Sequence, residues 1–175
     1  MFNDNLFFLD FAVGSVLSQK INNKTMLECG LSAYHLNQSQ QSFNSNIESK
    51  MPVKFNTYLT SSHKLSSGFL LNAHIFYSDQ QNISELLYGI DLMSPIDNNF
   101  LDEILVGIVI RDNDAMIPKI GFVFEKLNML LSYDINISKL SKASNNFGGL
   151  EFSLIYSWNK NKSVSEKKYL CPKYL

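Results

Sequence analysis

Several features that would assign this sequence to a common class of protein are scarce or absent. The three histidines and two cysteines do not show the His-x-His or Cys-x-x-Cys spacing of a zinc site. Cys29 falls on an apolar face and Cys171 in the C-terminal tail, which predicts one buried and one exposed thiol, not a disulfide. The 15 basic and 16 acidic residues give a formal net charge of -1, which argues against a nucleic-acid partner, because phosphates require a basic patch.

Long hydrophobic runs are also missing. The longest clear run, Ile104 to Ile110, ends at Arg111 and is far shorter than the roughly 18 residues of a membrane helix, so a helical membrane protein is excluded. No Gly-x-Ser-x-Gly elbow or glycine-rich phosphate loop is present. A lipid-hydrolysing barrel would need His35 with a nearby serine, and no spacing fixes that pair. We therefore predict a protein that is not an enzyme and has no cofactor or metal.

What the sequence does contain is a repeated alternation of apolar and polar residues, which is typical of strands with two unlike faces. In Phe69 to Tyr77, for example, Leu71 and Ile75 alternate with Asn72 and His74. The alternation predicts about nine strands of the length that a tilted membrane strand needs. The predicted strands are 6–17, 26–35, 53–59 (the weakest), 69–77, 86–92, 104–111, 118–125, 127–137 and 150–158.

The composition of the polar face indicates which solvent the other face meets. A soluble sheet usually exposes Lys, Glu and Thr, whereas here the polar face offers glycines, serines and isolated charges, as in a crowded polar lumen. The fold class predicted is therefore all-β, an antiparallel transmembrane β-barrel of about eight or nine strands, or the C-terminal part of one. The predicted lumen-facing polar residues are Asp10, Glu28, His74, Asp91, Arg111, Lys119, Glu125, Asp134 and Glu151.

We expect the barrel strands and loops to occupy residues 1–158 and a polar, basic tail to occupy residues 159–175. Asp134 and Glu151 fall on the polar faces of neighbouring predicted strands and could form a catalytic carboxylate pair. Ion pairing of such lumenal acids with Lys119 or Arg111 is the interpretation that we favour over catalysis.

Two stretches go beyond periodicity because they resemble a known family. Gly30 to Phe43 reads GLSAYHLNQSQQSF, and the stretches 132–141 and 148–156 read SYDINISKLS and GGLEFSLIY. The first resembles a strand and loop, and the other two the closing hairpin, of the PorP/SprF family of type IX secretion membrane proteins. The ending Cys171 to Tyr174 resembles the family's Cys-Pro-basic-aromatic tail, whereas Ser39 stands where the family usually has proline. Because family members are longer, the chain is expected to correspond to their C-terminal part.

The resemblance implies an outer-membrane protein that helps secreted proteins or surface adhesins of the gliding and secretion machinery to reach or stay at the cell surface. It implies contact with outer-membrane lipid and with periplasmic components of the machine. The residues expected to contact partners are Asn37, Gln38, Phe43, Lys167 and Lys168. The alternatives are a porin and a soluble or membrane β-barrel that binds or transports a small hydrophobic ligand; in the soluble form, the aromatic face would turn inward.

Overall fold

The computed structural model describes residues 7–40, 49–96, 100–138 and 147–158. Within these residues the regular structure consists of β-strands, and no helix is long and apolar enough to cross a membrane. The strands are β1 (Val13–Lys20), β2 (Thr25–Tyr34), β3 (Lys54–Lys64), β4 (Leu70–Gln80), β5 (Ile83–Pro95), β6 (Glu103–Arg111), β7 (Ala115–Val123), β8 (Leu127–Asn136) and β9 (Phe147–Tyr156).

All nine strands form one antiparallel sheet in which each strand pairs with its neighbours in sequence. This simple meander follows from the tight turns, such as the one at Gln81 and the one at Asn113, both of which adopt a positive φ. β1 and β9 are the two edges, so the sheet is not closed into a barrel within the described residues. The predicted all-β, antiparallel architecture is confirmed.

The strand boundaries correct the sequence prediction at several places. The first strand begins at Val13 and not at residue 6, and the segment 53–59, predicted to be weak, is part of the full-length strand β3. β7 ends at Val123, which leaves Glu125 in the turn before β8. In the β7–β8 ladder, pairing stops after Met116 and resumes at Lys119, because Pro118 between them has no backbone N–H to donate.

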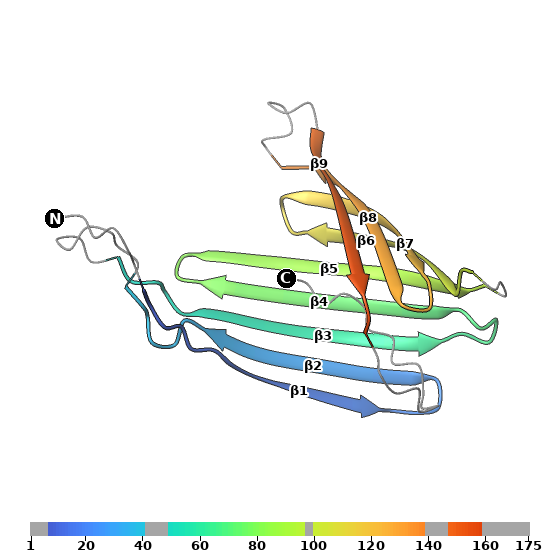
Figure 1. Cartoon of the computed structure of the whole chain (residues 1–175), viewed down its shortest axis with the longest axis horizontal. Coiled ribbons are helices and arrows are strands. Elements are labelled where there is room, and N and C mark those ends of the chain that lie inside the picture. The colour runs from blue at the N-terminus through green and yellow to red at the C-terminus, as the bar shows by residue number, and fades with distance from the viewer. Residues whose placement is uncertain (1–6, 41–48, 97–99, 139–146, 159–175) are drawn as a thin grey trace.

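The sheet is strongly curved. Figure 1 shows β1 to β5 lying side by side, while β6 to β9 turn steeply out of their plane. The connections at one end of the sheet, which we call the long-loop end, include residues 35–53 between β2 and β3 and residues 137–146 between β8 and β9. The opposite, short-turn end carries the connections 21–24, 65–69, 96–102 and 124–126 and the C-terminal end of β9.

Candidate functional site

The two faces of the sheet differ in a way that is unusual for a water-soluble protein: one exposes large apolar side chains, and the other buries charged side chains beside a small apolar cluster of Leu87, Val109, Ala115 and Ile117. On β4, His74 is 8% exposed, whereas its apolar neighbour Ile75 is 49% exposed. On β5, Asp91 is 1% exposed and Ile90 is 46% exposed. Because no second layer covers the polar face within the described residues, its burial comes from the curvature of the sheet itself. This burial argues against the soluble alternative, in which the aromatic face would turn inward.

The exposed face is apolar and ends in aromatic side chains. Phe55, Tyr77 and Tyr88 lie toward the long-loop end, and Tyr156 and Trp158 lie at the short-turn end, where their rings meet edge to face with centroids 5.9 Å apart. An apolar band between two sets of aromatic residues is the pattern of a strand surface in contact with lipid. Cys29 also lies on this face and is exposed, which corrects the prediction of a buried thiol.

An ion pair crosses the centre of the polar face. Lys119 Nζ on β7 lies 3.1 Å from Asp91 Oδ1 on β5, although β6 runs between the two strands. Gly107 on β6 is opposite both residues, and a Cβ atom built there would lie 1.9 Å from Asp91 Oδ1. The missing side chain is thus what allows the ion pair to lie flat against the sheet. His74 Nδ1 is 3.7 Å from the other carboxylate oxygen of Asp91.

A second ion cluster repeats this arrangement toward the long-loop end. Arg111 on β6 reaches Asp134 on β8 at 3.2 Å, passing over Ala115 of β7, which is fully buried. The same guanidinium lies 3.2 Å from Glu85 and 3.1 Å from Asp114. Arg111 therefore forms ion pairs with three carboxylates. The pairing of Asp134 agrees with the interpretation that lumenal acids meet Arg111 or Lys119, and gives no support to a catalytic carboxylate pair.

Near β1 the polar face carries a carboxylate that is held by hydroxyl groups. Glu28 accepts hydrogen bonds from Ser18 Oγ at 2.7 Å and from the Tyr58 hydroxyl at 2.9 Å. The Tyr58 ring occupies the space above Gly30, where an added Cβ would lie 2.1 Å from the ring. Small residues opposite large polar ones therefore recur along the polar face, and they let the long side chains reach across a strand.

Three further residues that were predicted to face the lumen lie outside the two ion clusters. Asp10 lies before β1 and pairs with His35 Nδ1 at 2.8 Å, at the long-loop end. Glu125 is exposed in the β7–β8 turn. Glu151 lies opposite Ser132, which lies opposite Lys119, so it is on the polar face, and it is exposed because β9 is an edge of the sheet.

The residues predicted to contact partners lie in one short segment and in parts of the chain outside the described residues. Asn37 holds the segment before β1: its side chain accepts a hydrogen bond from Phe11 N at 3.2 Å and donates to Leu9 O at 2.7 Å and Ser39 Oγ at 2.9 Å. Gln38 is exposed beside it in a left-handed conformation. Phe43, Lys167 and Lys168 lie outside the described residues.

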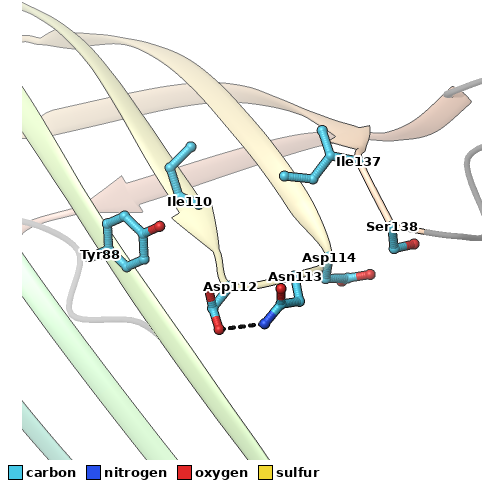
Figure 2. Close-up of a pocket in the computed structure, with 7 residues that line it drawn as sticks. All are labelled: Tyr88, Ile110, Asp112, Asn113, Asp114, Ile137 and Ser138. Carbon is cyan, nitrogen blue, oxygen red and sulfur yellow. Dashed lines mark hydrogen bonds between the residues drawn. The ribbon is translucent and has the colours of Figure 1, made fainter.

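A cavity of about 660 Å³ lies at the long-loop end, and Figure 2 shows the residues that line it. Tyr88 of β5 and Ile110 of β6 form one wall, Ile137 forms another, and the β6–β7 turn with Asp112 and Asp114 closes the lower side in this view. The cavity therefore combines apolar walls with carboxylates.

Comparison with known proteins gives one family. A model described as type IX secretion system membrane protein PorP/SprF matches residues 2–156. The chain belongs to this family. No curated protein matches the chain. The match extends across every described strand, so the burial pattern and the ion pairs across the sheet belong to the part of the chain that defines it as a family member.

In this PorP/SprF protein the stretches that resemble the family have defined structural positions. Gly30 to Tyr34 is the second half of β2, and His35 to Ser39 is the segment that holds residues 9–11. The stretch 132–141 begins with the second half of β8, and the stretch 148–156 is β9 without its first residue; the two strands pair along their length except at a bulge near Tyr133.

Sequence reasoning identified Asp91, Lys119 and Arg111 but missed the residues that support them. Alternation places Gly107, Ala115 and Tyr58 on the polar face, yet it does not show which residue lies opposite which. A glycine at a strand position of the polar face was the available signal, since glycine in a strand often marks a close approach.

Proposed function

We propose that this chain is an outer-membrane accessory protein of the type IX secretion and gliding machinery, and that it assists the secretion or surface attachment of partner proteins. The observation that carries the proposal is the burial pattern within a member of the PorP/SprF family: apolar residues cover the exposed face, and ion pairs are buried with a small apolar cluster on the other face. A surface with so many exposed large apolar side chains suits lipid, because soluble monomers rarely expose such large apolar patches.

The proposed orientation places the long-loop end outside the cell and the short-turn end in the periplasm, as in bacterial barrels with short periplasmic turns. The tail that follows β9 would then lie on the periplasmic side, where its lysines can contact components of the machine. The long-loop end would face secreted or surface proteins. The remaining polar strand residues, including Glu28 and Glu151, would line the inner surface of the barrel.

The side chains on the polar face argue against a porin that conducts solutes. The Asp91–Lys119 and Arg111–Asp134 pairs bridge alternate strands and occupy the space above β6 and β7. A small cavity of about 40 Å³, lined in part by Leu105 and Leu130, holds on the order of one water molecule. These features support an interior that is mainly filled by side chains. A filled interior favours a role in secreting or attaching proteins over a role in conducting solutes.

Deletion of the gene tests the proposal. We expect the deletion to remove a defined subset of proteins from the culture medium or cell surface, as measured by mass spectrometry of both fractions, and plasmid-borne wild-type protein to restore that subset. Separation of the two membranes on a sucrose gradient should place the chain with the outer membrane. An unchanged set of secreted and surface proteins would refute the accessory role, and a chain in the inner membrane would refute the proposed location.

A further inference from the structure

We draw no further inference here: the strongest candidate, the pair of sheet edges at β1 and β9, which have no partner strand within the described residues, carries nothing because nothing in the structure shows which strand covers them.

Discussion

Replacing Lys119 with methionine should be among the most destabilising single changes in the chain. Methionine keeps most of the length of the side chain and removes its charge, so the carboxylate of Asp91, which is 1% exposed, loses its partner at 3.1 Å. The remaining positive candidate in the described surroundings is His74, whose Nδ1 is 3.7 Å away. Breaking a buried pair from one side costs about 3–5 kcal/mol, because an uncompensated charge stays buried.

The double variant Asp91→Asn, Lys119→Met separates the loss of the pair from the cost of the stranded charge. With both charges gone, we expect most of the stability to return, to within about 1–2 kcal/mol of wild type, since a neutral pair needs no counter-charge. Lys64→Met is the control: Lys64 is exposed at the end of β3, and its replacement should change stability by less than about 0.5 kcal/mol.

The assay is a urea titration of the full-length chain in lipid vesicles, with folded and unfolded forms separated by their mobility on unheated gels. The reasoning is refuted if Lys119→Met loses less than about 1 kcal/mol, or if the double variant is no more stable than Lys119→Met.

Further changes test other parts of the structure. Gly107→Ala should cost roughly 1–3 kcal/mol in the same titration, because its Cβ would displace the carboxylate of Asp91, whereas Gly149→Ala, with no atom within 4 Å of its Cβ, should be nearly neutral; equal effects would contradict the close approach. Ile90→Lys on the exposed face should destabilise the chain in vesicles by about 2–4 kcal/mol if that position meets the bilayer centre, and a neutral result would exclude lipid contact there. Asn37→Ala should speed hydrogen exchange at the amides of the segment before β1 roughly tenfold, and unchanged exchange would show that the Asn37 hydrogen bonds do not hold it.

Strand positions were largely predictable because an alternating face leaves a direct trace in the sequence. His74 and Ile75, or Asp91 and Ile90, point to opposite faces whatever the rest of the chain does. The prediction was weakest in β3, where Thr57 and Ser61 stand among the outward-facing residues and blur the pattern. It was wrong at the start of β1, because residues 7–12 alternate like a strand but are held by single contacts with residues 35–39 and not by a full ladder.

The candidate site was predictable only as a list of polar residues. Alternation places Asp91, Lys119 and Arg111 on one face, and it also allows Asp134 to pair with either cation. The register decides the pairing: Lys119 lies opposite Gly107, which lies opposite Asp91, and Arg111 lies opposite Ala115. Asp10 and Glu125 could not be separated from the lumenal set, because their positions depend on where β1 begins and β7 ends.

The sequence by itself determined that the chain forms antiparallel strands with one apolar and one polar face, since side-chain direction along a strand depends only on its period of two. Several stretches of the sequence that resemble the PorP/SprF family also indicated this family. Only the tertiary structure decided which face is buried, because burial of the polar face depends on how the whole sheet curves. It also decided that ion pairs cross intervening strands over Gly107 and Ala115, since contacts between non-adjacent strands require both register and curvature.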